Sequence, residues 1–137
     1  MAVEAGALGA VIETAAELDD AAAERALAAL ELMCTVTEGA AELRAHALAV
    51  PVMVATMGRM AARAKEYAIS VLSVIYGGGG SEDQAAPPVE EVARAVALAL
   101  QGDCSARGRR KGAQLLKVLE DEEEEEKEVE ENEYRQN

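Results

Sequence analysis

Residues 26–34 read ALAALELMC and residues 68–76 read AISVLSVIY, and these two stretches, about forty positions apart, decide the fold. In both stretches apolar residues recur at the spacing i, i+3, i+4, i+7, which places them on one face of an α-helix. The matched positions are Ala26, Ala29, Leu30, Met33 and Cys34 in the first stretch, and Ala68, Val71, Leu72, Ile75 and Tyr76 in the second. The chain therefore contains the same amphipathic helix twice.

A second helical pattern precedes each of these stretches. Its apolar positions are Leu8, Val11, Ile12 and Ala15 in the first copy, and Val50, Met53, Val54 and Met57 in the second. A third copy follows, with Val89, Val92, Ala93 and Val96, and then Gly112, Leu115, Leu116 and Leu119. Two helices in a unit of about forty residues are typical of armadillo and HEAT repeats. We therefore predict an all-α, armadillo/HEAT-like α-solenoid of about three repeats within residues 1–119, at 8–49, 50–88 and 89–119.

Turn and cap residues divide the pattern into individual helices. Asp19 and Asp20 can cap a helix, Gly39 can end one in the left-handed conformation, and Pro51 suits a first helical turn. Four consecutive glycines and a Pro-Pro pair predict a flexible loop at residues 77–88. The predicted helices are Val3–Leu18, Ala21–Thr37, a short Ala40–Leu48, Val50–Met60, Arg63–Tyr76, Val89–Gln101 and Arg109–Asp121.

Composition and charge limit the classes of partner. Phe and Trp are absent, so the core must consist of Ala, Leu, Val, Ile and Met. The net charge is −13, of which residues 120–137 carry −9, and we predict that this acidic tail is disordered or a frayed helix. An acidic chain disfavours nucleic acid as the main partner, because that binding needs Lys and Arg against phosphates. No apolar run is long enough to span a bilayer, so we expect no membrane partner and place the protein in the cytoplasm, with the nucleus as a second compartment.

Three segments carry a family resemblance. They are Glu38-Gly39 with Ala45-His46-Ala47-Leu48, then Leu100-Gln101-Gly102-Asp103-Cys104, and then Lys111-Gly112-Ala113-Gln114-Leu115-Leu116-Lys117. Together they resemble the C-terminal armadillo region of plant U-box E3 ubiquitin ligases, over about residues 21–119. The resemblance implies a module that holds a protein substrate of ubiquitination, often in stress and defence signalling. A ubiquitin-charged E2 enzyme would bind only through a U-box, which this sequence does not contain. We therefore expect a fragment, a truncated product or a partial gene sequence.

Two other functions remain open on the sequence alone. One is a stand-alone, non-catalytic helical-repeat scaffold with no link to ubiquitin. The other is an acidic, chaperone-like protein that binds basic proteins through residues 120–137. Helical repeats serve many functions, so the fold does not decide among these three.

The residues that could carry chemistry are few. His46 has no second ligand or catalytic partner near it in sequence, and we assign it a structural role. We predict that Cys34 is a buried apolar residue, and that Cys104, in a polar turn, is exposed and unreactive. Arg107, Arg109, Arg110 and Lys111 could form a nuclear-localisation or anion-binding patch, but we favour a solvated helix start attracted to the acidic tail. We predict no catalytic residue, no metal site and no cofactor.

A stripe of polar residues is the candidate binding surface. It lies on the side of the second helix of each repeat that faces away from the core positions. The stripe comprises Glu24, Glu31 and Thr35 in the first copy, Glu66, Ser70 and Ser73 in the second, and Arg110, Gln114 and Lys117 in the third. In an armadillo stack these helices lie side by side and line the concave surface, which solenoids use for binding. We therefore predict one groove, acidic at the first repeat and basic at the last, with space above Ser70 and Ser73 for a partner segment.

Overall fold

Helices account for all the regular structure that can be described. The computed structural model describes residues 6–15, 17–58, 62–77 and 89–135, except for the side chains of residues 126, 134 and 135. Within these ranges it contains no strand and seven helices, which are α1 (Ala7–Ala15), α2 (Asp20–Met33), α3 (Thr37–Ala45), α4 (Ala49–Met57), α5 (Ala62–Gly77), α6 (Val89–Gln101) and α7 (Ala106–Arg135). The all-α prediction is confirmed. The predicted loop after Gly77 and the predicted helix ends at Val3 and Met60 lie outside the described residues.

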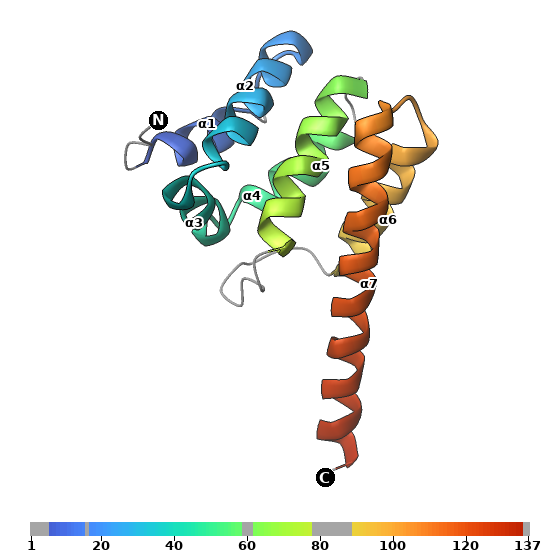
Figure 1. The fold of residues 1–137 in the computed structure, drawn as a ribbon. Coiled ribbons are helices and arrows are strands. Elements are labelled where there is room, and N and C mark those ends of the chain that lie inside the picture. Colours follow the sequence, from blue (N-terminus) through green and yellow to red (C-terminus); the bar gives the residue numbers. More distant parts are fainter. Residues whose placement is uncertain (1–5, 16, 59–61, 78–88, 136–137) are drawn as a thin grey trace.

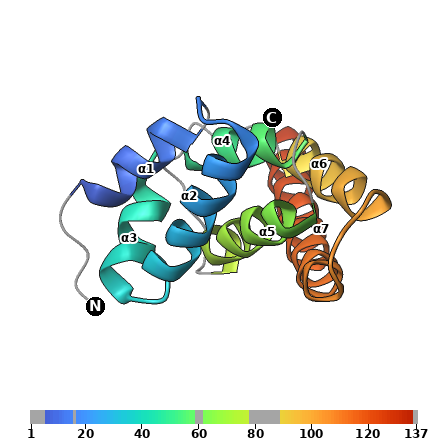
Figure 2. The same ribbon diagram turned by 90° about the horizontal axis from the view of Figure 1, so that it is seen from above.

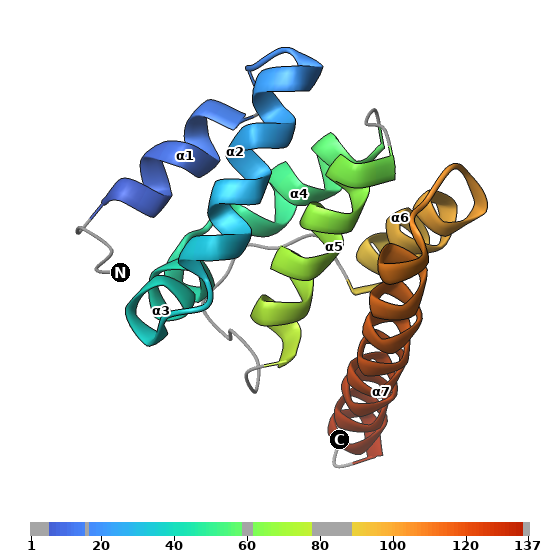
Figure 3. The ribbon, with the colours of Figure 1, turned by 45° about the horizontal axis from the view of Figure 1, so that its top comes forward.

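The helices form two layers, as a stack of armadillo-like repeats requires. Seen from above, α1, α4 and α6 follow one another in one row, and α2, α5 and α7 follow in a second row (Figure 2). Each helix of the first row packs on its successor in the chain, as α1 on α2, α4 on α5 and α6 on α7. In the second row α5 contacts both α2 and α7 (Figure 3). The second helices of the three predicted copies therefore lie side by side.

The matched apolar positions of the first row, together with those of α7, lie in the core. Leu8, Ile12 and Ala15 of α1 are fully buried, and so are Val50 and Met53 of α4. In the third copy Val92 and Val96 of α6 and Leu115 and Leu119 of α7 are buried in the same way. These residues belong to one apolar cluster that extends from α1 to α7, so the two layers share a single core.

The buried face of α2 differs from the predicted one. Ala29 is exposed and Ala26 is half-buried, whereas Leu27 and Leu30 are fully buried together with Ala23. Alanine occupies so many positions of this helix that the apolar spacing fits two adjacent faces. The larger side chains of Leu27 and Leu30 bury more apolar area, and the helix turns that side toward α1 and α5.

The boundary between α2 and α3 also differs from the prediction. Asp19 caps α2 as predicted, since its carboxylate accepts a hydrogen bond of 2.9 Å from the Ala22 N–H. However, α2 ends at Met33, and the predicted short helix begins at Thr37, three residues before the predicted start. Gly39 is therefore a buried residue inside α3 and does not end a helix, as we had predicted. Among the described glycines, Gly6 is the one with a positive φ.

Helix α5 lies at the centre of the molecule and is buried on several sides. Its buried residues are Ala64, Ala68, Ile69, Ser70, Val71, Leu72 and Ile75. It contacts α2, α3, α4 and α7. From α3, Arg44 donates two hydrogen bonds, of 3.2 and 3.1 Å, to the Val74 carbonyl near the end of α5. This contact fastens the short helix to the second repeat.

The acidic C-terminal segment, for which we predicted a disordered tail or a frayed helix, is helical. Helix α7 continues without a break to Arg135 and projects beyond the rest of the molecule (Figure 1). Glutamate has a high helix propensity, and Lys127 pairs with Glu123 one turn away at 3.4 Å. The described side chains of α7 beyond Glu123 are all exposed, so this part of the helix needs no apolar face.

Truncation of Leu72 tests whether α5 is buried at the centre of the molecule. It is fully buried, so we expect Leu72→Ala to lower the free energy of unfolding by about 2–5 kcal/mol, as other truncations of buried leucines do. The control is Leu98→Ala, the same change at a side chain that is 61% exposed in α6, where we expect less than about 0.5 kcal/mol. Urea unfolding followed by circular dichroism measures both. Equal stability of the two variants would contradict the burial of α5.

Candidate protein-binding surface

The predicted polar stripe lies along α2, α5 and α7, and its residues differ in accessibility. Thr35, Arg110, Gln114 and Lys117 are exposed at its two ends. Glu24, Glu31, Glu66 and Ser73 are half-buried, and Ser70 is buried. The stripe is therefore accessible at α7 and near the end of α2, but much less so in between.

A charged bridge connects the three helices of the stripe. Arg107 Nη2 lies 2.9 Å from Glu31 Oε1, and Arg107 Nη1 lies 3.3 Å from Glu66 Oε2. Ser105 Oγ donates a further hydrogen bond of 2.9 Å to Glu66 Oε1. The hydrogen bond from Arg107 to Glu31, more than any other contact, raises the pKa of the guanidinium. Two acidic residues of the predicted groove are thus paired within the protein.

Ser70 does not provide space for a partner, as we had predicted it would. Its side chain is only 3% exposed, and its Oγ accepts a hydrogen bond of 3.0 Å from Lys111 Nζ. Helix α7 begins at Ala106, before the predicted start, and Lys111 in its second turn lies over the middle of α5. The predicted groove is closed at this point.

The basic cluster fastens α7 to the rest of the protein. Arg109 donates hydrogen bonds of 3.0 and 3.4 Å to the carbonyls of Leu100 and Gly102, where α6 ends. Arg107 and Lys111 bind α2 and α5 as described above, and Arg110 is exposed. The cluster does open α7, and Arg107, Arg109 and Arg110 are exposed as a solvated helix start requires. The contacts of Arg107, Arg109 and Lys111 are with α2, α5 and the end of α6, however, and not with the acidic tail.

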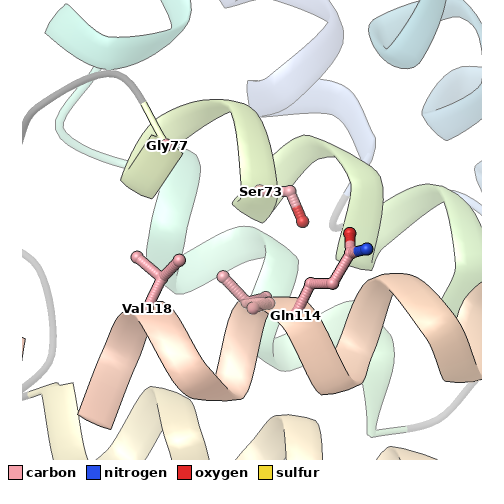
Figure 4. Close-up of a pocket in the computed structure, with 5 residues that line it drawn as sticks. Ser73, Gly77, Gln114 and Val118 are labelled. Carbon is pink, nitrogen blue, oxygen red and sulfur yellow. The ribbon is translucent and has the colours of Figure 1, made fainter. Parts of the chain in front are cut away.

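A small open pocket lies between the end of α5 and the middle of α7. Its volume is about 190 Å³, and it is lined by Ser73, Gly77, Gln114, Leu115 and Val118. Ser73 and Gln114 face each other across one end, while Val118 points toward the last turn of α5 (Figure 4). Sequence reasoning placed Ser73 and Gln114 on the binding stripe but missed the hollow, since no sequence signal shows how far apart two helices lie.

His46 and the cysteines make contacts that hold helices together. His46 Nδ1 accepts a hydrogen bond of 3.1 Å from the Leu48 N–H, and its ring lies so close to α1 that a Cβ on Gly9 would be 3.2 Å from it. Cys34 is 8% exposed, and burial raises the pKa of its thiol to about 11, with Arg44 opposing that shift. Cys104 is half-buried, where we had predicted exposure, because Gly108 leaves space for its sulfur.

The described part of the chain offers neither a metal-binding cluster nor a membrane span. It contains no group of three or more His, Cys, Asp or Glu residues arranged to hold a metal ion. None of its helices is both long enough and apolar enough to cross a membrane.

The layered helices and their shared core define the class, an armadillo-type helical-repeat protein. The sequence comparison then gives the family. Residues 1–137 match the family described as the plant U-box protein ARM repeat region, and the chain belongs to this family. No solved structure matches the chain.

Curated relatives agree with this assignment. The chain is 40% identical to U-box domain-containing protein 26 of Arabidopsis thaliana over 123 residues, and 37% identical to U-box domain-containing protein 25 of the same plant over 122 residues. U-box domain-containing protein 30 of Arabidopsis thaliana is 29% identical over 118 residues. The alignments cover 85–88% of this chain but 26–29% of the relatives, so the chain spans less than a third of their length.

The charged bridge predicts a stability that depends on salt. We expect Arg107→Met to lower the melting temperature at low ionic strength, because it leaves Glu31 and Glu66 close together without a cation. The loss should shrink in 1 M salt, since Arg107 is partly exposed and ions screen such charges. Arg110→Met, on the exposed side of the same helix, is the control and should leave the melting temperature unchanged. A melting temperature of Arg107→Met equal to that of wild type at low salt would contradict a stabilising bridge.

Cys34 predicts a slow and pH-dependent thiol reaction. Raising its pKa from 9.0 to about 11 lowers the thiolate fraction at pH 8 about 100-fold. In a Cys104→Ala background, iodoacetamide should therefore modify native Cys34 at least about 100-fold more slowly than the urea-unfolded chain. As the pH rises, the thiol of the unfolded chain loses its proton before the native thiol does. The contribution of Cys34 to the free energy of unfolding is therefore fully present below pH 9 and is lost between pH 9 and about 11. Equal rates in the native and unfolded protein would show that Cys34 is not buried.

Proposed function

We propose that this chain is the partner-binding armadillo module of a U-box E3 ubiquitin ligase. The observation that carries the proposal is the family match over the whole chain, together with relatives named for their U-box domain. In such a ligase the U-box binds the ubiquitin-charged E2 enzyme, and the repeats hold the protein that receives ubiquitin. The proposal extends to stress and defence signalling in the cytoplasm and nucleus, as the family resemblance implies.

The partner binds on the face formed by α2, α5 and α7. Support comes from the side-by-side order of these helices, since adjacent repeats of a solenoid present a continuous surface. The exposed part of this face comprises Thr35 near the end of α2 and Arg110, Gln114 and Lys117 on α7. Because Lys111 closes the middle, the half of the face on α7 carries most of the contact.

Paired charge variants test this function. Thr35→Arg with Lys117→Glu alters two exposed residues of the face and leaves the bridge at Arg107 intact. The control is Ala55→Arg with Arg94→Glu, which alters exposed residues on α4 and α6, in the other layer. Each version is joined to the U-box of U-box domain-containing protein 26 of Arabidopsis thaliana. The fusion is expressed in plant cells and isolated with its bound proteins.

Reaction of the isolated complexes with E1, E2 and ubiquitin measures modification of the bound proteins. We expect the face variant to lose bound proteins and their ubiquitination at least about tenfold, while the control retains both. All versions should melt within a few degrees of one another. Unchanged binding by the face variant would place the site elsewhere, and binding without ubiquitination in every version would indicate a scaffold.

A further inference from the structure

The pocket between α5 and α7 has the size of a site for one side chain. Its volume of about 190 Å³ is below the roughly 300–1,000 Å³ of pockets that hold cofactors and drug-sized ligands. Two of its lining residues, Gly77 and Gln114, are exposed, so the pocket is open to solvent between the two helices (Figure 4). A single large aliphatic side chain, presented by a segment that lies across the opening, matches these dimensions.

The walls of the pocket favour an apolar occupant. Leu115, which is 2% exposed, forms the base, and Val118 forms one side. On the opposite side, the Ser73 hydroxyl already donates a hydrogen bond of 2.9 Å to the Ile69 carbonyl, so it offers little to a polar ligand. Gly77 contributes no side chain, and a Cβ built on it would meet no atom within 4 Å. A charged side chain would lose part of its hydration against Leu115 and Val118, and the two polar side chains of the pocket, Ser73 and Gln114, lie together at its other end.

The charges around the opening favour an acidic residue next to the apolar one. On α7, Arg110 and Lys117 lie about one turn to either side of Gln114, and all three are exposed. The α5 side contributes Ser73 and Gly77, which are uncharged. Asp121 and Glu122 lie further along α7, past Val118, and they repel an acid at that end. An acidic residue of the partner would therefore pair with Arg110 or Lys117, on the side of the pocket away from Asp121 and Glu122.

The spacing of the two partner residues follows from simple geometry. Arg110 and Leu115, the base of the pocket, are five residues apart, which is about 7.5 Å along a helix. In an extended segment, residues two positions apart are about 6.6 Å from each other and point to the same side. We propose that the pocket binds a leucine or methionine of an extended partner segment that carries Asp or Glu two positions away. This inference rests on the proposed function, because it specifies what the α7 half of the binding face recognises.

Designed peptides test the inference directly on the whole chain. The probes are blocked eight-residue peptides of Gly and Ser that carry Asp and Leu two positions apart, with Leu→Ala and Asp→Lys versions as comparisons. Titration followed by the amide NMR signals of Ser73 and Gln114 gives the affinity and the location together. We expect the Asp–Leu peptide to bind about tenfold more tightly than the Ala version, because three more carbon atoms are buried. The Lys version should bind more weakly than the Asp version.

A variant of the protein that fills the pocket tests whether the peptide binds there. Gly77→Leu places a side chain in the hollow without touching the core, and it should weaken binding of the Asp–Leu peptide about tenfold. Gly58→Leu, at the end of α4, is the control, because a Cβ there would lie at ordinary contact distance, 3.8 and 4.0 Å, from the Ala55 and Val54 carbonyl oxygens, and the substitution should change neither binding nor melting temperature. Equal binding by the Leu and Ala peptides, or full binding by Gly77→Leu, would overturn the inference. If the peptides fail while the Thr35 and Lys117 variants still lose partners, the pocket assignment is lost and the proposed function stands.

Discussion

The burial of α5 among its neighbours is the constraint on which the rest of the fold depends. Ile69 and Leu72 are fully buried, and Ala68 allows the surrounding helices to approach closely. Helices α2, α4 and α7 each contact α5, while α1 and α6 are attached through them. With no Phe or Trp in the chain, many medium-sized side chains must each bury area at roughly 25 cal/mol per Å². The helices can satisfy this only by packing in two layers around α5.

Polar contacts then fix how the helices of the second layer lie against each other. Arg107 joins Glu31 and Glu66, and Lys111 reaches Ser70, so α7 is attached to both α2 and α5 near its start. These contacts are partly exposed, and each contributes modestly to stability. Their larger effect is on the proposed binding face, because they pair its acidic residues and close its centre. The exposed basic residues Arg110 and Lys117 then determine the charge of the accessible part.

This distribution of charge matters for the proposed role. The chain as a whole is strongly acidic, and the end of α7 carries most of that charge away from the packed helices (Figure 1). The α7 residues that line the pocket, Gln114, Leu115 and Val118, lie beside Lys117 and just before the acidic segment. A partner segment with one acidic and one apolar residue fits this local pattern, whereas the net charge alone would suggest a basic partner. Armadillo proteins in general bind many kinds of segment, so such local features decide specificity.

The sequence by itself determined the helices and most of their buried faces. The spacing of Val92 and Val96, or of Leu8 and Ile12, identifies one side of a helix, and the bounds Val89–Gln101 of α6 agree with the prediction. The family resemblance was also readable from three short segments. These features are local, since they depend on the period of the helix and on turn residues within a few positions.

Only the tertiary structure decided which neighbour covers each flank of a helix. Alanine is small enough to fit either face, so the sequence of α2 did not show that Leu27 is buried and Ala29 exposed. The partners of Arg107 are 41 and 76 positions away, and the burial of Ser70 depends on where α7 lies above α5. The pocket likewise depends on the distance between two helices. Helical periodicity describes one helix at a time, whereas these features arise from the packing of several.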